Sequence, residues 1–273
     1  YILSLYFHMQ NSPKEVSNIF QNNSIETSPG LTIDDLNRYL PAVQTYKEIN
    51  LSKDKMKEGM FLTDCLKGIR RIPAGSIDLI ITDPTGAPFI DKQFRLEDYF
   101  QWNKNWLIEA RRVLKEAGSI YLMTNWQYSS MFHSLLNNIF KVRSRIIWRN
   151  RSSKVENKKG WIDDTSDIWY ATKSNEFVFL KNDESKTDTN NINNSSSNLW
   201  VDIPRGLDKN SIYSQKLYLR MIKSSTYKLN WVLDPFMSIG DVGVASKVSG
   251  RRFIGFEKDK DSLLLAMKRV DRG

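Results

Sequence analysis

Short apolar runs alternate with longer amphipathic stretches through the middle of the chain, between residues 59 and 149. Short apolar runs bounded by polar turns are typical of strands, whereas the longer stretches repeat their apolar positions at helical spacing. The pattern predicts strands at 59–63, 77–82, 119–123 and 142–149, with helices near 96–115 and 127–138. Strands that alternate with helices are typical of an α/β fold with a mostly parallel sheet and helices on both faces.

The C-terminal part of the chain has a more specific pattern. An apolar strand at 231–234 is followed by a small-residue turn around Gly240, a helix through 244–248 and a second strand at 253–256 that ends in Glu257. This order is typical of the first βαβ unit of a Rossmann-like nucleotide-binding fold, in which the acid binds the ribose hydroxyls. Since the chain ends 16 residues after Glu257, the other strands of such a sheet are expected upstream.

A second candidate for chemistry follows the apolar strand at 76–82. This strand runs directly into Asp83 and Pro84. Reactive groups of α/β enzymes commonly lie at the carboxyl ends of buried strands. An Asp-Pro pair at a strand end is also common as a simple turn, so both interpretations stay open on this pattern alone.

Together, these two patterns resemble the β class of amino DNA methyltransferases, in which the catalytic motif precedes the S-adenosylmethionine motif. The resemblance rests on Asp83-Pro84 first and on Asp234-Pro-Phe-x-x-x-Gly240 last. Residues 59–66 resemble the family's Gly-Asp-Cys strand. Residues 107–118 with 120–123 resemble the helix and strand after its catalytic motif, and residues 214–217 resemble its Thr-Gln-Lys-Pro helix start. The resemblance covers roughly residues 56–270 and implies a circularly permuted methyltransferase order.

The sequence departs from the family pattern at two places. The catalytic tetrad of the family is Asp, Asn or Ser followed by Pro, Pro and an aromatic residue, whereas this chain has Asp83-Pro84-Thr85-Gly86. The family's cofactor turn is Gly-Ser-Gly-Thr-Thr, and here it is Ser238-Ile-Gly-Asp-Val242. Gly240 is kept, which allows a close approach of the backbone, and Asp241 is compatible with an N-cap of the helix that follows.

The resemblance implies how the catalytic residues act. The exocyclic amine of a base is a poor nucleophile, because its lone pair is delocalised into the ring. Two acceptors, the Asp83 carboxylate and the Pro84 carbonyl, would orient this amine toward a sulfonium methyl group. The base must leave the duplex to reach them.

An aromatic side chain is expected to stack on the extruded base. Gly86 stands where the family has that aromatic residue, so Phe89 is the nearest candidate, with Trp126 and Trp148 as alternatives. The predicted catalytic residues are Asp83, Pro84, Thr85 and Phe89.

The resemblance also implies a site for S-adenosylmethionine. Glu257 would bind the ribose, and Asp234 and Phe236 would border the methionine part and the adenine. Asp64 resembles the acid that binds the adenine amine, with an ordinary surface carboxylate as the alternative, and Lys216 would pair with the methionine carboxylate or lie solvated at a helix start. The predicted cofactor-binding residues are Asp64, Lys216, Asp234, Phe236, Gly240 and Glu257.

Composition narrows the remaining possibilities. The chain has 273 residues, of which 40% are hydrophobic, enough for one large domain with a core, and no apolar run reaches the ~20 residues of a membrane span. A single cysteine, Cys65, excludes an internal disulfide and a cysteine-based zinc site and is typical of a reducing cytoplasm. No metal centre and no membrane partner are expected, and His133 lies on a predicted apolar helix face, which favours a structural role.

The chain divides into segments by composition. Residues 1–55 are predicted to form an N-terminal appendage outside the sheet, in which 1–8 resemble a tag-derived remnant and 32–40 form a short capped helix. Residues 56–273 are predicted to form the methyltransferase domain, with a target-recognition insertion at about 149–213. Within this insertion, residues 166–180 are predicted to form two strands with a turn between them.

A basic cluster opens the insertion. The net charge of +9 is compatible with a nucleic-acid partner, and equally with a lysine-rich composition that has no such meaning. Because the cluster lies between the catalytic and cofactor motifs, phosphate contact along DNA is favoured over a solvated loop. The predicted DNA-binding residues are Arg149, Arg151, Lys154, Lys158 and Lys159.

These patterns predict a cytoplasmic enzyme that transfers a methyl group from S-adenosylmethionine to an exocyclic amine of double-stranded DNA. Aspartate as the first tetrad residue favours adenine N6, with cytosine N4 as the alternative. A catalytically weak or inactive nucleic-acid-binding subunit is the second hypothesis, because Thr85-Gly86 lacks the stacking aromatic. An RNA or small-molecule methyltransferase is a third. Whether the chain acts alone, as a homodimer or with a second methyltransferase or specificity subunit stays open.

Overall fold

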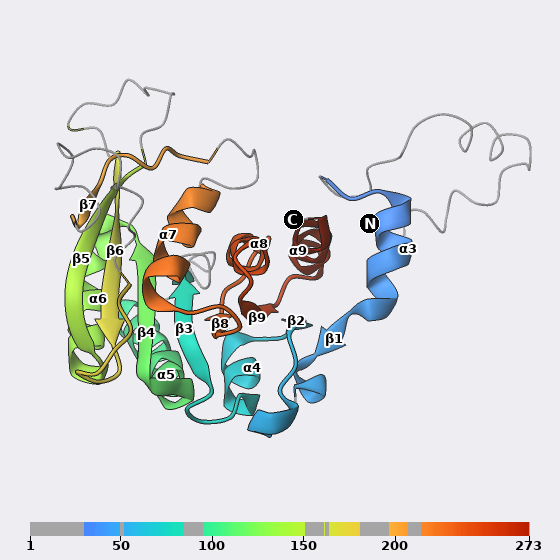
Figure 1. The fold of residues 1–273 in the computed structure, drawn as a ribbon, viewed down its shortest axis with the longest axis horizontal. Coiled ribbons are helices and arrows are strands. Elements are labelled where there is room, and N and C mark those ends of the chain that lie inside the picture. Colours follow the sequence, from blue (N-terminus) through green and yellow to red (C-terminus); the bar gives the residue numbers. More distant parts are fainter. Residues whose placement is uncertain are drawn as a thin grey trace, which may run out of the picture.

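The computed structural model describes residues 30–49, 52–84, 95–150, 161, 164–180, 197–206 and 214–272. Within these ranges the chain folds around a 9-stranded sheet in the order β1-β2-β9-β8-β3-β4-β6-β5-β7 (Figure 1). The strands are β1 Gln44–Thr45, β2 Gly59–Leu62, β3 Ile77–Thr82, β4 Leu114–Thr124, β5 Lys141–Arg149, β6 Thr165–Thr172, β7 Leu199–Trp200, β8 Trp231–Asp234 and β9 Arg252–Glu257. The α-helices are α3 Ile33–Tyr39, α4 Cys65–Arg71, α5 Leu96–Val113, α6 Trp126–Ile139, α7 Gln215–Ser225, α8 Asp241–Val248 and α9 Lys260–Arg272.

Neighbouring strands run parallel except at β6, which is antiparallel to both β4 and β5. The predicted mostly parallel, Rossmann-like sheet is therefore confirmed. β5 and β6 are neighbours in the sequence as well as in the sheet. A parallel connection needs a crossover segment, usually a helix, across one face of the sheet. The described residues between β5 and β6 contain no such helix, which agrees with their antiparallel pairing.

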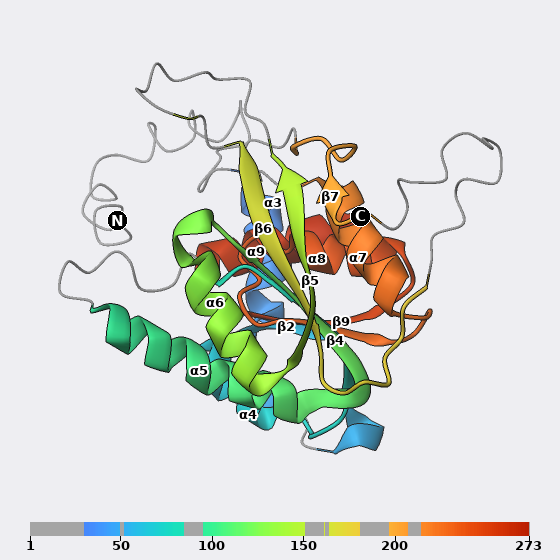
Figure 2. The ribbon, with the colours of Figure 1, turned by 90° about the vertical axis from the view of Figure 1, so that its left-hand side faces the viewer.

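Helices cover both faces of the sheet, with α4, α5 and α6 on one face and α7, α8 and α9 on the other (Figure 2). The alternation of side chains along β3 shows why both faces need cover. Ile80 packs into the core under α4 to α6, whereas Leu79 and Ile81 pack into the core under α7 to α9, and all three are fully buried. A strand that is apolar on both faces is typical of the centre of an α/β sheet.

The N-terminal segment contributes to the sheet, contrary to the prediction for residues 1–55. β1 lies at the edge and pairs parallel with residues 61–62 of β2. The prediction of an appendage outside the sheet is therefore wrong for residues 44–45. A two-residue edge strand is held by backbone hydrogen bonds, which any polar sequence can make. No periodic pattern of side chains therefore predicts it.

Helix α3 docks this same segment on α9. Thr32 begins the helix with a capping box, in which its hydroxyl accepts from the Asp35 N–H at 3.2 Å and its own N–H donates to the Asp35 carboxylate at 2.9 Å. Leu31 and Tyr39 are buried against Leu264 of α9. The expected capped helix is thus present, and it packs on the C-terminal helix.

The predicted insertion at 149–213 is in part sheet. β6 and β7 lie beside β5 and extend the central sheet, so this range is not a separate module. The second strand expected within 166–180 is not formed, and residues 176–180 lie outside the sheet. Instead, the Leu180 N–H donates to the Ser224 carbonyl near the end of α7 at 2.7 Å.

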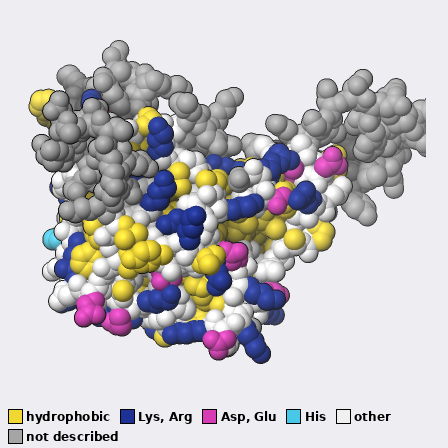
Figure 3. Space-filling model, viewed as in Figure 1, with side chains coloured by type: hydrophobic (Ala, Val, Ile, Leu, Met, Phe, Trp, Pro, Cys, Tyr) yellow, Lys and Arg dark blue, Asp and Glu magenta, His cyan; other side chains and the backbone are white. Residues whose placement is uncertain are grey.

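Figure 3 shows Lys and Arg side chains spread over the visible side of the molecule, with fewer Asp and Glu among them. Among the described helices, none combines the length and the apolar composition that a membrane crossing requires.

Gly68 in α4 offers a test of the packing between this helix and the sheet. A Cβ atom at residue 68 would lie 2.9 Å from three ring carbons of Phe256, which is fully buried in β9. Gly68→Ala would gain about 1 kcal/mol of helix propensity, but overpacking a core typically costs about 1–3 kcal/mol. We therefore expect a net loss of stability in urea unfolding. Lys67→Ala, on the exposed side of the same helix, is the matched control and should change stability by less than about 0.5 kcal/mol. A more stable Gly68→Ala variant would contradict this packing.

Candidate active site

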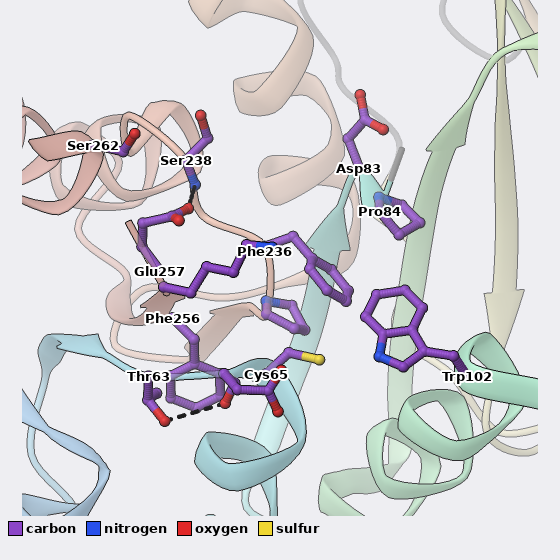
Figure 4. Close-up of a pocket in the computed structure, with 13 residues that line it drawn as sticks. Thr63, Cys65, Asp83, Pro84, Trp102, Phe236, Ser238, Phe256, Glu257 and Ser262 are labelled. Carbon is purple, nitrogen blue, oxygen red and sulfur yellow. Dashed lines mark hydrogen bonds between the residues drawn. The ribbon is translucent and has the colours of Figure 1, made fainter. Parts of the chain in front are cut away.

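A cavity of about 340 Å³ opens at the carboxyl ends of four adjacent strands, β2, β9, β8 and β3 (Figure 4). This size lies within the range of small-molecule sites. Residues at the end of a strand or just after it line the cavity, together with one residue each from α4, α5 and α9: Thr63, Asp64, Cys65, Asp83, Pro84, Trp102, Pro235, Phe236, Ser238, Phe256, Glu257, Lys258 and Ser262. Two motifs that are about 150 residues apart in the sequence therefore share one cavity.

Glu257, at the end of β9, is held by two backbone groups. The Ser238 N–H donates to its Oε2 atom at 2.9 Å, and the Asp259 N–H donates to its Oε1 atom at 2.8 Å. Figure 4 shows the first of these bonds at the side of the cavity. Each carboxylate oxygen keeps acceptor capacity for a further donor, so the carboxylate can bind a diol without losing its orientation.

The turn that supplies Ser238 depends on unusual backbone angles. Ser238 has φ 48° and Gly240 has φ 82°, a left-handed conformation that favours glycine. A Cβ atom at residue 240 would also lie 2.9 Å from Cβ of Ala266 in α9. Gly240 was predicted to contact the cofactor, but it is not among the residues that line the cavity, and the close neighbour that requires glycine is α9.

Asp241, considered above as an N-cap, is instead the first residue of α8. Gly240 takes the N-cap position. The Asp241 carboxylate forms an ion pair with Arg269 of α9 at 2.7 Å.

Asp64 is both a helix cap and a cavity residue. Its Oδ1 atom accepts from the N–H groups of Leu66 and Lys67 at 2.9 and 3.3 Å and so begins α4. It lines the cavity beside the buried Cys65. Burial and the charge of Asp64 raise the pKa of the Cys65 thiol far above its usual range, so the thiol stays neutral.

Asp234 lies below the cavity and does not line it. Its side chain is 4% exposed. Burial raises the pKa of this carboxyl to about 8, and the charges of Asp83 and Glu257 act in the same direction. Hydrogen bonds from the Phe236 N–H and from Thr82 lower the pKa and offset part of this rise. The contact of Asp234 with the methionine part stays a prediction. In this structure its Oδ1 atom accepts from the N–H of Phe236, a lining residue, at 3.1 Å.

Asp83 and Pro84 follow β3 and line the cavity opposite Glu257 (Figure 4). The other two predicted catalytic residues, Thr85 and Phe89, lie outside the described residues, as do Arg151, Lys154, Lys158 and Lys159 of the basic cluster. Arg149, the remaining member, ends β5 and pairs with Asp164 at 3.4 Å.

Trp102 is a cavity residue that the sequence reasoning missed. It stacks on Tyr99, with ring centroids 6.1 Å apart and an interplanar angle of 16°, and contacts Phe236 with centroids 5.4 Å apart. Burial raises the pKa of Tyr99 to about 12, and the Asp83 charge acts in the same direction. Trp102 lines the same cavity as Asp83 and Pro84, which places this aromatic group beside the Asp-Pro motif. Aromatic residues at helical spacing along α5, at 99, 102 and 106, carried the signal, but such a stripe ordinarily indicates core packing.

The two tryptophans proposed as alternative stacking residues lie elsewhere. Trp148 is fully buried and donates from Nε1 to the Ile203 carbonyl at 2.9 Å, so that proposal is wrong. Trp126 is 61% exposed at the start of α6, which follows the carboxyl end of β4.

Lys216 also lies away from the cavity. It is not a lining residue, and its charge instead contributes to the lowered pKa of Asp202, for which the hydrogen bond from Arg220 is the main cause. His133 is exposed on α6, not on its apolar face, and stacks on Trp169 with ring centroids 4.6 Å apart. The described part of the chain holds no cluster of three or more His, Cys, Asp or Glu side chains suited to a metal ion.

The lining of the cavity fits a cationic nucleoside. Three carboxylates, Asp64, Asp83 and Glu257, and one lysine, Lys258, are its charged side chains, so its potential favours a positive ligand. Phe236 and Trp102 provide an aromatic surface for a planar ring. These donors and acceptors match the hydroxyls, the amine and the sulfonium of S-adenosylmethionine.

Comparison with known proteins agrees with this geometry. The DNA methylase family N6_N4_Mtase matches residues 77–268. DNA adenine methyltransferase YhdJ from Escherichia coli K12 is 29% identical over 238 residues, which cover 76% of this chain and 81% of the relative. The PvuII DNA methyltransferase, described as cytosine-N4-specific, has a similar fold, with a TM-score of 0.64 and 18% identity over 77% of this chain and 85% of that one. The S-adenosylmethionine complex of M1.HpyAVI has a TM-score of 0.60 and 25% identity over 78% of this chain and 98% of that one.

The raised pKa of Asp234 predicts a specific pH dependence. In the unfolded chain the carboxyl ionises near pH ~4, whereas in the folded protein it keeps its proton up to about pH 8. Between these values the folded state binds more protons, so the free energy of unfolding falls as pH rises. Asp234→Asn removes this titration and keeps an acceptor for Phe236, so its stability relative to the wild type should increase from pH 4 to pH 8. Urea unfolding across that range measures the difference, and a difference independent of pH would contradict the prediction.

Proposed function

Since the chain belongs to the N6_N4_Mtase family of DNA methylases, we propose that it methylates the exocyclic N6 amine of adenine in double-stranded DNA and that the cavity at the ends of β2, β9, β8 and β3 is its active site. One observation carries the assignment of the site. The Asp83-Pro84 motif and Glu257 line the same cavity, so acceptors for an amine and for a ribose lie within one small-molecule volume.

Asp83 and Pro84 would orient the target amine. The Asp83 carboxylate accepts from one N–H and the Pro84 carbonyl from the other. The amine can then pyramidalise, and its lone pair is freed from the ring. The proline ring restricts its own φ angle, which fixes the direction of the peptide at this point. Orientation by fixed acceptors lowers the barrier because it needs no reorganisation during the reaction.

Glu257, Asp64, Phe236 and Trp102 would hold the cofactor. Glu257 would bind the ribose hydroxyls, Asp64 would accept from the adenine amine, and the two aromatic side chains would pack on the adenine ring. When bound, S-adenosylmethionine supplies the electrophilic methyl group. The three acidic side chains that line the cavity would favour the cationic sulfonium over an anion.

Two observations favour adenine over cytosine. Aspartate at residue 83 resembles the first tetrad residue of adenine enzymes more than the serine common among cytosine enzymes. YhdJ, the relative with 29% identity, is named an adenine methyltransferase. Cytosine N4 is the alternative substrate, and the fold shared with the PvuII enzyme is compatible with either base.

Cofactor binding is tested by Glu257→Ala. Loss of charged hydrogen bonds to the ribose should weaken S-adenosylmethionine binding by ~1.5–3 kcal/mol, which isothermal titration calorimetry can measure. Glu116→Ala removes a carboxylate that is 76% exposed on β4 and pairs with Lys173, and it is the control for the change in net charge. Equal affinity in the wild type and in Glu257→Ala would refute the ribose assignment.

Catalysis is tested by Asp83→Ala together with product analysis. We expect this variant to lose methyl transfer from labelled cofactor to unmethylated DNA while its cofactor affinity stays close to that of the wild type. Digestion of the wild-type product to nucleosides should yield N6-methyladenine. Recovery of N4-methylcytosine would overturn the adenine assignment. A wild-type protein that binds cofactor but methylates no DNA, alone or with its genomic neighbours, would favour the non-catalytic subunit. An active Asp83→Ala variant would place the active site elsewhere.

A further inference from the structure

Helix α9 contacts the cofactor turn on the side away from the cavity. Arg269 donates from one guanidinium nitrogen to the Ile239 carbonyl at 2.7 Å, and its other terminal nitrogen lies 2.7 Å from the Asp241 carboxylate. Both side chains of the ion pair are largely buried, with 19% and 12% exposure. A single side chain thus spans the turn on both sides of Gly240.

The shape of this turn decides where the Glu257 carboxylate lies. The Ser238 N–H that binds Glu257 belongs to a residue in the left-handed region, and such a conformation persists only where the surroundings hold it. The Met237 N–H donates to the Phe256 carbonyl at 2.9 Å, and the Gly240 N–H donates to the Met237 carbonyl at 2.9 Å. The guanidinium of Arg269 closes the far side of this network.

The negative charge of Asp241 favours a cation at the position of the Arg269 guanidinium. The usual turn of the family has threonine at this point, and aspartate adds a negative charge under a cavity that is already lined by three carboxylates. A buried carboxylate without a partner is strongly unfavourable. Arg269 neutralises this charge in the same contact that holds the turn.

The adjoining side of α9 is attached to the N-terminal segment. Asp35 of α3, which is 4% exposed, pairs with Lys268 at 2.7 Å and with Arg272 at 2.9 Å. These hydrogen bonds and ion pairs lower the pKa of Asp35 to about 2, with the Lys268 bond as the largest cause, so it is ionised at neutral pH. Figure 1 shows α9 between α8 and α3, so consecutive residues of one helix contact the cofactor turn and the N-terminal helix.

We propose that Arg269 is a positioning residue for the cofactor turn and that the N-terminal helix, through Asp35, holds α9 in the place from which Arg269 acts. The inference rests on the proposed cofactor site. It assigns to residues 30–49 a role in cofactor binding rather than that of an appendage.

Two measurements on the full chain test this role. The first is the affinity for S-adenosylmethionine by calorimetry, with KM for the cofactor and kcat for DNA methylation measured separately. The second is hydrogen exchange of the amides of residues 237–241, which needs no ligand. We expect Arg269→Met to raise the dissociation constant about tenfold or more, Arg269→Lys to give an intermediate value, and Asp35→Asn to raise it about threefold. KM should rise with kcat at saturating cofactor unchanged, and exchange in the turn should accelerate in the same order.

Asp78→Asn is the matched control for a merely structural effect. Asp78, at the amino end of β3, is also a mostly buried carboxylate, bonded to Lys115 at 2.8 Å and to the Trp231 N–H at 2.8 Å. This variant should lower the unfolding temperature but leave cofactor affinity and exchange in the turn unchanged. Arg38→Ala removes the exposed ion pair of α3 with Asp271 and should change neither cofactor affinity nor exchange in the turn.

The outcomes separate this inference from the proposed function. If the wild type binds no S-adenosylmethionine, the proposed cofactor site fails, and hydrogen exchange still decides whether Arg269 holds the turn. If the wild type binds the cofactor and Arg269→Met keeps both its affinity and its exchange protection, the positioning role is overturned. An Asp35→Asn variant that behaves like Asp78→Asn would overturn the contribution of the N-terminal helix.

Discussion

Parallel hydrogen bonding places the carboxyl ends of β2, β9, β8 and β3 side by side at one edge of the sheet. Each of these ends continues into a segment that leaves the sheet, and each segment carries polar or aromatic groups to the same cavity. Because the strands are buried on both faces, their register admits little variation without exposing apolar side chains. Asp64, Asp83 and Glu257 lie at the ends of these strands or just after them, so their relative positions depend on the backbone ladder of the sheet.

The electrostatics of the site follow from this convergence. Asp64, Asp83 and Glu257 line the cavity, and Asp234 lies buried beneath it. Four ionised carboxylates so close together would repel one another. Burial keeps Asp234 neutral up to about pH 8, which reduces that repulsion and leaves the charge on the residues that face the cavity. The result is a negative pocket with an aromatic wall, which suits a cationic methyl donor.

Helices α3 and α9 meet behind the cofactor turn. The N-terminal helix α3 packs on α9, and α9 packs on the turn through Ala266 and Arg269. The basic α9 carries cations toward both neighbours, and the carboxylates that pair with Lys268, Arg269 and Arg272 come from other elements.

The sequence by itself determined the elements whose evidence is local. The apolar runs that end in Asp83 and Glu257 predicted strands and their terminal acids, because burial on both faces requires continuous apolar residues and the polar residue after them marks the exit from the sheet. The Gly240 turn and the Thr32 cap could likewise be predicted from the sequence, since each depends on the conformational preference of one or two residues. Their spacing also predicted the βαβ unit, and the permuted order came from the resemblance of the two motifs to a known family.

Only the tertiary structure decided which distant groups meet. Trp102 enters the cavity because α5 packs beneath the Asp-Pro motif, Lys216 stays out of it, and Gly240 is required by Ala266 rather than by a ligand. β1 joins the sheet through backbone hydrogen bonds that leave no mark in side-chain pattern. Arg269 was one cation among many in a basic chain until packing set it against Asp241. Such contacts depend on strand order and helix packing, which are properties of the whole chain, whereas periodicity and turn chemistry are properties of a few neighbouring residues.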